Sequence, residues 1–168
     1  RAVISAEEDR WEYGIRSRRL ERRAHYCVTD EHISLHLNES PRMSLVAFNE
    51  DRDEIIDLRG KDKDGILEWD TPRGNWQIIE YVCIPDEDND RPDILSYEAS
   101  EKFLDTAFEL FADLLEPYMG KTVTHFYFHD LAFDSRNRHD WTEKFNEVFA
   151  QRFGFDPAPY YPYLFVRS

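Results

Sequence analysis

The stretch Ile66-Leu67-Glu68-Trp69-Asp70-Thr71-Pro72-Arg73-Gly74-Asn75-Trp76 decides the fold class of the first half of the chain. Residues 66–69 are mostly apolar, and in residues 76–82 Trp76, Ile78 and Val82 alternate with Gln77 and Glu80. This period of two is typical of a β-strand with one buried face. Pro72 and Gly74 lie between the two segments and predict a turn. The stretch therefore predicts two strands joined by a turn.

More strands are expected on the N-terminal side of this stretch. Residues 33–37 alternate in the same way, and residues 45–48 form a short apolar run. Asp62-Lys63-Asp64-Gly65 follows residues 55–58 and predicts a hairpin with its glycine in the left-handed conformation. We therefore expect a small antiparallel β unit of five or six strands over residues 25–92.

The hydrophobic period becomes 3.6 in the second half of the chain. Ser96 is a good N-cap for a helix that ends at Gly120, and a broad apolar stripe runs between them. Residues 123–128 follow as an apolar strand, of the kind that is buried on both faces in parallel sheets. We expect His125 to be a hydrogen-bonded core histidine in that strand.

We expect a second helix between Asp140 and Gly154. Asp140 and Glu143 fit a capping box at its start, and Gly154 ends it. Residues 156–164 contain several prolines and predict an extended segment. Helix, strand and helix in this order form an α/β unit over residues 93–168. The fold class is therefore α+β, with the small antiparallel β unit followed by a helix–strand–helix unit.

Residues 1–24 are a separate charged segment. Ser5 and Glu8 fit a capping box, so we expect a helix there. The arginines of residues 16–23 are read as a solvated face that pairs with acidic residues, and an RNA or anion site is the alternative. Because the chain starts with Arg1, we expect a processed or trimmed piece.

Charge and composition exclude several classes of function. The chain has 168 residues, with 21 Lys+Arg against 35 Asp+Glu and a net charge of −14. Nucleic acid is not expected as a partner, because phosphate binding needs concentrated basic residues. No apolar run approaches the roughly 20 residues of a membrane span. Aromatic residues make up 15% of the chain, which predicts a folded protein with an aromatic core or a surface that stacks on sugars or bases.

Two further features of the sequence bear on disulfides and metal ions. Cys27 and Cys83 are expected to be unpaired buried thiols, and a disulfide is the alternative if their strands are neighbours. The acidic connector of residues 85–92 is read as a solvated loop. Calcium is the alternative there because it prefers clustered carboxylate oxygens, but the spacing of an EF-hand is absent. We expect no other metal and no organic cofactor.

The order of these motifs resembles large α-L-rhamnosidase-like glycoside hydrolases of family 106. The resemblance is carried by Leu95-Ser96-Tyr97-Glu98-Ala99, Gly120-Lys121-Thr122-Val123, Asp140-Trp141-Thr142 and the segment 152–162. The stretch from Gly65 to Trp76 is similar to the family pattern G-x-L-x-W-D-x-P-x-G-x-W of a small β domain. The resemblance implies that the helix–strand–helix unit is part of a (β/α)₈ barrel, which needs about 250 residues when complete.

The resemblance also implies a site at the end of the strand 123–128. The family places an acid/base glutamate on the following loop, where this chain has Asp130 in one alignment and a position near Asp134 in another. The resemblance further implies that the second carboxylate comes from a later barrel strand. If the chain acts on carbohydrate, we expect His129 beside Asp130 to contact the substrate, and Trp141 or Tyr127 to offer a surface that stacks on the sugar. Structural roles are the alternative for two residues near this site. Asp140 would cap the second helix, and Trp141 would be a hydrophobic staple residue before the same helix.

Two functions follow from the sequence. The first is a fragment or reduced relative of a glycoside hydrolase that acts on rhamnose-containing polysaccharide with an altered acid/base position. The alternative is a non-catalytic carbohydrate-binding or structural domain. A barrel fragment would expose sheet edges and apolar helix faces, so we also expect self-association or association with the rest of a larger chain.

Overall fold

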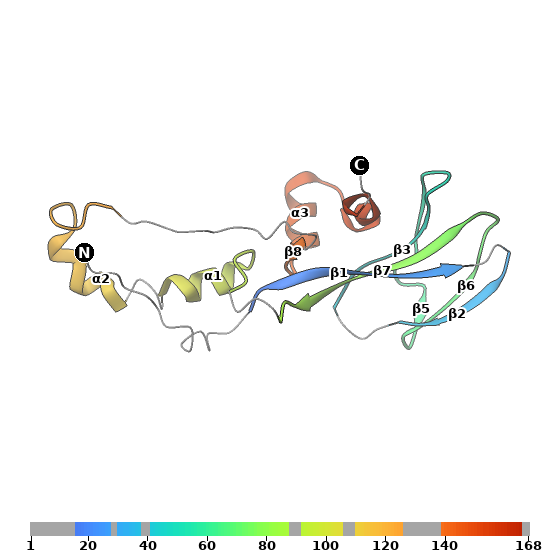
Figure 1. The fold of residues 1–168 in the computed structure, drawn as a ribbon, viewed down its shortest axis with the longest axis horizontal. Helices are drawn as coiled ribbons and strands as arrows, with labels where there is room; N and C mark the ends of the chain where they lie inside the picture. The colour runs from blue at the N-terminus through green and yellow to red at the C-terminus, as the bar shows by residue number, and fades with distance from the viewer. Residues whose placement is uncertain are drawn as a thin grey trace. The chain divides into compact units, whose positions relative to one another are not determined.

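A computed structural model describes residues 16–27, 30–37, 41–87, 92–105, 110–125 and 139–165. The chain divides into two compact units. Residues 1–19 and 85–142 form one, which we call the helical unit, and residues 20–84 and 143–168 form the other, which we call the sandwich unit. Antiparallel strands and short helices together confirm the α+β fold class (Figure 1).

The sandwich unit is built from two sheets. Within this unit one sheet has the strand order β4-β3-β7-β1, and the other has the order β2-β6-β5. The strands are β1 (Arg18–Cys27), β2 (His32–His36), β3 (Arg42–Asn49), β4 (Glu54–Asp57), β5 (Asp62–Lys63), β6 (Ile66–Asp70) and β7 (Trp76–Pro85). The first two residues of β1 and the last residue of β7 belong to the helical unit. These strands confirm the antiparallel β unit expected from the period of two.

A hydrophobic core lies between the two sheets. The antiparallel pairing of β2 with β6 places Leu35 opposite Leu67, and that of β3 with β7 places Ala47 opposite Ile78. Residues of both sheets share one buried cluster: Leu37, Leu45, Ala47, Leu58, Leu67, Trp69, Trp76 and Ile78. Alternation along each strand sends every second side chain to this core, which fixes the register of each pair.

The hairpin between β5 and β6 has the expected turn. Lys63 pairs with Ile66, and the two residues between them have φ of 50° at Asp64 and 75° at Gly65. Positive φ at both positions is the type I′ arrangement that matches the strand twist. Residues 55–58 do not pair with residues 66–69 across this turn. Residues 55–57 lie in β4, which pairs with β3 instead, and Leu58 follows that strand.

The C-terminal segment covers the other face of β3 and β7. It consists of α3 (Phe145–Phe153) and the 3₁₀ helix η4 (Ala158–Leu164). The Ser44 hydroxyl donates a hydrogen bond to the Ala158 carbonyl over 2.6 Å, and the rings of Tyr81 and Tyr161 pack edge to face with centroids 5.5 Å apart. Strands β3 and β7 are therefore buried on both faces.

Two expectations for the C-terminal segment are wrong. Residues 158–164 form a 3₁₀ helix rather than an extended chain, because proline fixes φ near the helical value. Asp140 does not cap α3, since it lies in β8 (His139–Trp141) and Lys144 is the N-cap residue. The expected end of the helix is confirmed, because Gly154 has a φ of 78° and its N–H donates to the Ala150 carbonyl.

The helical unit contains α1 (Tyr97–Leu104), α2 (Leu110–Leu115), the 3₁₀ helix η3 (Glu116–Tyr118) and β8. The Ser96 hydroxyl accepts a hydrogen bond from the Ala99 N–H, which confirms the expected N-cap. The α-helix gives way to a 3₁₀ turn at Pro117, which lacks the N–H that an α-helix needs. Gly120 follows with a φ of 75°, as expected for a residue just beyond a helix end.

Three other expectations differ from the structure. Residues 18–24 lie in β1 and are not helical, while residues 5–15 lie outside the described residues. His125 is exposed and contacts the Thr124 hydroxyl over 2.8 Å, so it is no core histidine. Of the strand expected at 123–128, Val123 forms one isolated bridge with Met119, and the rest of its described part has no strand structure.

Candidate functional site

Most of the expected site residues fall in one segment of the chain. Tyr127, His129, Asp130 and Asp134 lie in residues 126–138, outside the described residues. Trp141 is described and lies at the end of β8, with 7% of its surface exposed. Stacking on a sugar needs an exposed ring face, so this burial favours a packing role for Trp141. Its contact with a substrate stays a prediction.

A buried carboxylate that the sequence analysis did not select lies in the same unit. Asp93 is 3% exposed, and its Oδ1 atom accepts a hydrogen bond from the Leu95 N–H over 3.0 Å. Burial raises the pKa of the Asp93 carboxyl above its usual value, while a hydrogen bond from Thr142 acts in the opposite direction. Asp93 thus braces the start of α1 through the Leu95 N–H. Its position three residues before the N-cap Ser96 was the sequence signal available for it.

The sandwich unit contains a second buried carboxylate, Glu80 of β7. It is fully buried, with Arg42 Nε at 3.5 Å from Oε1 and His25 Nε2 at 3.8 Å from Oε2. Arg42 also contacts Asp62 Oδ1 through Nη1 over 3.0 Å. A buried carboxylate needs such partners, because desolvation otherwise penalises its charge. Its lack of exposure excludes direct contact with a substrate.

An exposed polar cluster lies on β2 and β6. His32 contacts Asp70 Oδ1 through Nδ1 over 2.7 Å and Glu68 Oε2 through Nε2 over 2.8 Å. The Ser34 hydroxyl donates to Glu68 Oε1 over 2.6 Å. The hydrogen bonds to Asp70 and Glu68 raise the pKa of His32 above its usual value. Within the described residues, no set of three or more His, Cys, Asp or Glu side chains is arranged to hold a metal ion.

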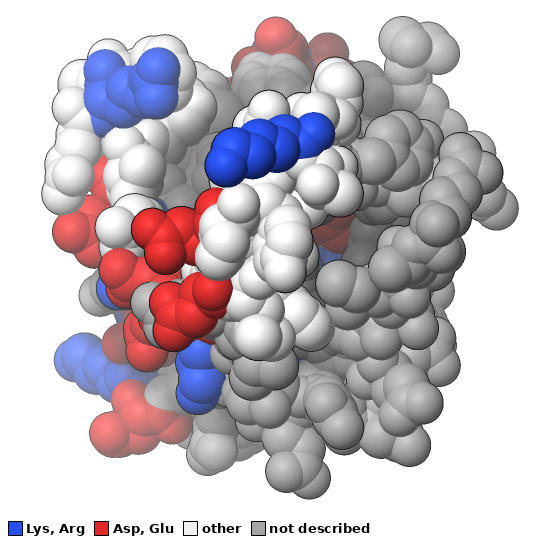
Figure 2. All heavy atoms as spheres, turned by 90° about the vertical axis from the view of Figure 1, so that its left-hand side faces the viewer, with Lys and Arg blue, Asp and Glu red and all other residues white. Residues whose placement is uncertain are grey.

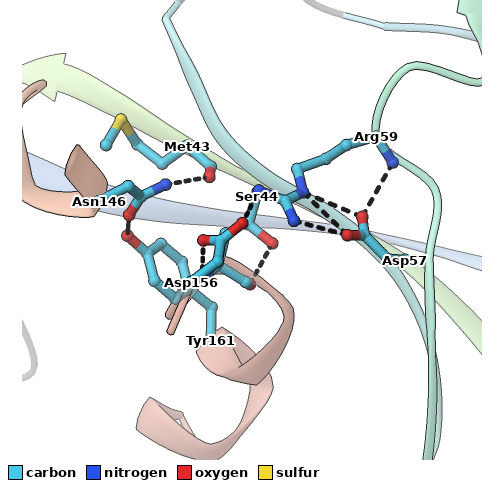
Figure 3. Close-up of polar contacts among 8 residues, drawn as sticks. Met43, Ser44, Asp57, Arg59, Asn146, Asp156 and Tyr161 are labelled. Atoms are coloured by element: carbon cyan, nitrogen blue, oxygen red, sulfur yellow. Dashed lines mark hydrogen bonds and ion pairs between the residues drawn. The ribbon is translucent and has the colours of Figure 1, made fainter. Parts of the chain in front are cut away.

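Polar contacts hold the C-terminal segment on the sheet (Figure 3). Arg59 contacts Asp57 Oδ2 through Nη2 over 2.6 Å and Asp156 Oδ2 through Nη1 over 2.7 Å. Asn146 of α3 donates to the Met43 carbonyl over 2.8 Å and accepts a hydrogen bond from the Tyr161 hydroxyl. Residues more than 90 positions apart in the sequence are therefore joined by side-chain hydrogen bonds and ion pairs.

The helical unit exposes apolar side chains. Tyr97 is 82% exposed and Leu114 68%, and Leu104, Tyr118 and Met119 are also exposed. Uncharged side chains share the face drawn in Figure 2 with acidic and basic ones. Of the described residues in the expected apolar stripe, Leu104 and Leu114 are exposed, whereas Phe103, Phe111 and Leu115 are half-buried. None of the described helices has the length and apolar character that crossing a membrane requires.

The chain matches one protein family over nearly its whole length. A family model described as alpha-L-rhamnosidase, of glycoside hydrolase family 106, matches residues 4–167. The chain belongs to this family. No curated protein and no solved structure matches it. The family resemblance that the motifs indicated is thereby confirmed.

The rhamnosidase-like motif of the β unit has a structural role here. Trp69 and Trp76 pack edge to face in the core, with ring centroids 6.0 Å apart. Gly74 lies between them with a φ of 142°, and a Cβ atom there would lie 2.5 Å from Asn49 Nδ2 and 3.2 Å from Trp76 Nε1. The motif therefore combines two core tryptophans with a glycine that no larger residue can replace without strain.

Proposed function

We propose that this chain acts on rhamnose-containing polysaccharide as a fragment or reduced relative of a family 106 glycoside hydrolase. The family match over residues 4–167 carries the proposal. The core positions of Trp69 and Trp76, and the place of Gly74 in the turn between their strands, support it, because they fit the motif of the family's small β domain. The expected partner is therefore a carbohydrate.

Asp130 is the proposed acid/base residue, and Asp134 is the second candidate for that role. Glycoside hydrolysis needs two carboxylates, about 5–5.5 Å apart in retaining enzymes or 6.5–9.5 Å apart in inverting ones. Neither buried carboxylate described above competes for the role, since Glu80 is fully buried and Asp93 is 3% exposed. An aspartate is one methylene shorter than the family's glutamate, so the backbone has to approach the scissile bond more closely.

His129, Tyr127 and Trp141 are the proposed sugar contacts around this acid. The second carboxylate would come from a later strand of the barrel, contributed by a larger chain or by an associated one. Any barrel would then be complete only together with that partner. This dependence is one reason to test binding and hydrolysis separately.

A non-catalytic role is the second candidate, and one observation favours it. Tyr97, Leu114 and Tyr118 of the helical unit expose more than half of their surface, as an interaction domain would. In this role the chain would bind carbohydrate or pack against a partner without turning over a substrate.

Hydrolysis of p-nitrophenyl α-L-rhamnopyranoside by the purified chain tests the first role, with titration of a rhamnose oligosaccharide in parallel. Turnover that is lost in Asp130→Asn, and kept in the exposed control Asp113→Asn, supports catalysis through Asp130. Turnover that is lost only in Asp134→Asn moves the acid/base role to that residue. Binding without turnover in every variant supports the non-catalytic role.

A further inference from the structure

Two buried aspartates of the helical unit differ in how their charge is compensated. Asp86 is 4% exposed, and Arg19 Nη1 lies 3.7 Å from its Oδ1 atom. Asp93 is 3% exposed, but no arginine or lysine in the described part of the chain forms an ion pair with it. Burial without such a partner disfavours the charged form of a carboxyl group. The two acids are therefore equally buried but unequally paired.

Hydrogen bonds satisfy only one oxygen of the Asp93 side chain among the described residues. Oδ1 accepts a hydrogen bond from the Leu95 N–H over 3.0 Å, and the main-chain carbonyl of Asp93 accepts one from the Ser96 N–H over 3.0 Å. These bonds form the turn that leads into α1. Oδ2 is also buried, and it has no partner with hydrogen-bond geometry in the described part of the chain. As a carboxylate oxygen it loses its hydration without a replacement.

Three elements of the helical unit act on the Asp93 carboxyl. Arg18 of β1 attracts the charged form, and Thr142, directly after β8, favours the charged form through its hydroxyl. The N–H groups of Leu95 and Ser96 before α1 act in the same direction. Desolvation is the largest effect, and it raises the pKa of Asp93 above its usual value in spite of these groups. The buried carboxyl therefore holds a proton more readily than an exposed aspartate does.

We propose that Asp93 is a pH-sensitive switch at the start of α1. As the solution becomes acidic, the carboxyl takes up one proton, and the neutral form holds α1 more firmly than the charged form does. Protonation removes the cost of burying a charge and makes Oδ2 a donor, for which the Thr142 hydroxyl offers lone pairs. Oδ1 keeps its bond to the Leu95 N–H. The switch is independent of the proposed function, since it needs no saccharide.

The expected pH dependence has a definite sign. The pKa of Asp93 is raised in the folded state, whereas an unfolded aspartate titrates at about 3.9. The folded state therefore binds the proton more tightly than the unfolded state does. The contribution of Asp93 to stability rises as the pH falls through its raised pKa, and it is complete at about pH 3.9. Above the raised pKa the buried charge opposes folding.

An NMR titration of the side-chain Cγ of Asp93 in the unaltered chain tests the proton uptake. We expect a midpoint above the value of about 3.9 for an exposed aspartate. A midpoint at or below that value overturns the switch, because the buried carboxyl would then hold its charge as easily as an exposed one. This measurement requires no variant to fold.

Asp93→Asn tests what the proton does for α1. Asparagine keeps the Oδ1 acceptor and carries an N–H donor in place of Oδ2, so it imitates the neutral acid. The amide-exchange protection of the Ser100 N–H, which donates to the Ser96 carbonyl, reports on the start of α1. At pH 7 we expect this protection to be about two- to tenfold higher in the variant, the effect of one net hydrogen bond. The gain should shrink as the pH falls toward about 4, because the unaltered chain is then protonated as well.

Asp86→Asn is the matched control, since it removes one charge from an equally buried acid of the same unit that has an arginine beside it. A gain in Asp93→Asn that shrinks in acid, with no gain in Asp86→Asn, supports the switch. An equal gain in both variants overturns it, because the net charge of −14 would then account for the effect. Protection that falls in Asp93→Asn, or a gain that does not change with pH, also overturns it.

Discussion

Gly74→Ala should destabilise the sandwich unit through two separate effects. The φ of 142° at Gly74 is a conformation that residues with a side chain rarely adopt, and holding one there costs about 1–3 kcal/mol. The new Cβ would also lie 2.5 Å from Asn49 Nδ2 and 3.2 Å from Trp76 Nε1, and such overpacking costs about 1–3 kcal/mol more. The expected loss in the free energy of unfolding is therefore about 2–6 kcal/mol.

Gly60→Ala is the matched control for this substitution. Gly60 also has a positive φ, of 72°, but a Cβ there would meet no atom within 4 Å. Its cost is that of the left-handed conformation alone, about 1–2 kcal/mol. The difference between the two alanine variants therefore contains the contact with Asn49 and Trp76 together with the difference in backbone cost between a φ of 142° and one of 72°.

Urea unfolding followed by tryptophan fluorescence measures this difference, because Trp69 and Trp76 lie in the affected core. With a slope of about 2 kcal/mol per molar urea, a difference of about 2 kcal/mol separates the two midpoints by about 1 M. Midpoints that agree within error would refute the reasoning, since the crowding at Gly74 would then have no energetic effect. If the slope of the free energy of unfolding against urea concentration is the same for both variants, both unfold from an equally compact state.

Three further outcomes are expected. Ser96→Ala removes the N-cap of α1 and should lower its stability by about 0.5–2 kcal/mol, seen as faster amide exchange of α1 than in the unaltered chain. Tyr161→Phe leaves the side-chain Oδ1 of Asn146 without its hydroxyl donor and should cost about 1–3 kcal/mol in urea unfolding, with equal stability of both proteins as the contrary result. Asp70→Asn should lower the pKa of His32 toward 6.5 in an NMR titration. Because that pKa is raised in the folded state, the contribution of His32 to stability is complete below about pH 6.5 and is lost as the pH rises through the raised value.

The sequence predicted the elements whose signals are local. The alternation at residues 33–37 and the mostly apolar residues 66–69 became β2 and β6, and the Asp64-Gly65 turn has the expected left-handed glycine. These predictions succeed because a period of two and a positive φ depend only on neighbouring residues. Ser96 was found for the same reason, since an N-cap is read from the residue and the helix that follows.

Predictions failed where a distant partner decides the structure. The arginines of β1 lack an apolar stripe, yet Arg22 donates to Gln77 Oε1 of β7 over 2.7 Å and so lies on a sheet. Asp140 and Glu143 fit a capping box, but Asp140 lies in the strand β8. No local pattern could pair Asn146 with Met43, whose contact spans 103 positions.

The expected catalytic site also depends on residues that lie far apart in the sequence. Asp130 was proposed from a family motif and from its place after an expected strand, neither of which states which second carboxylate it faces. Asp93 has no periodic signal in the sequence, and its place three residues before the N-cap Ser96 does not reveal that its side chain is buried.

The residues that identify the family and the residues that would perform its chemistry are under different constraints. Trp69 and Trp76 pack in the core of the sandwich unit, and Gly74 is held at a positive φ close to Asn49 and Trp76, so replacing any of the three costs stability whatever the chain does. An acid/base residue on a loop contributes to turnover and little to folding, so glutamate can be replaced by aspartate there without loss of the fold. Membership of a rhamnosidase family is therefore stronger evidence for how this chain packs than for what it catalyses. Its catalysis has to be established by measuring turnover directly.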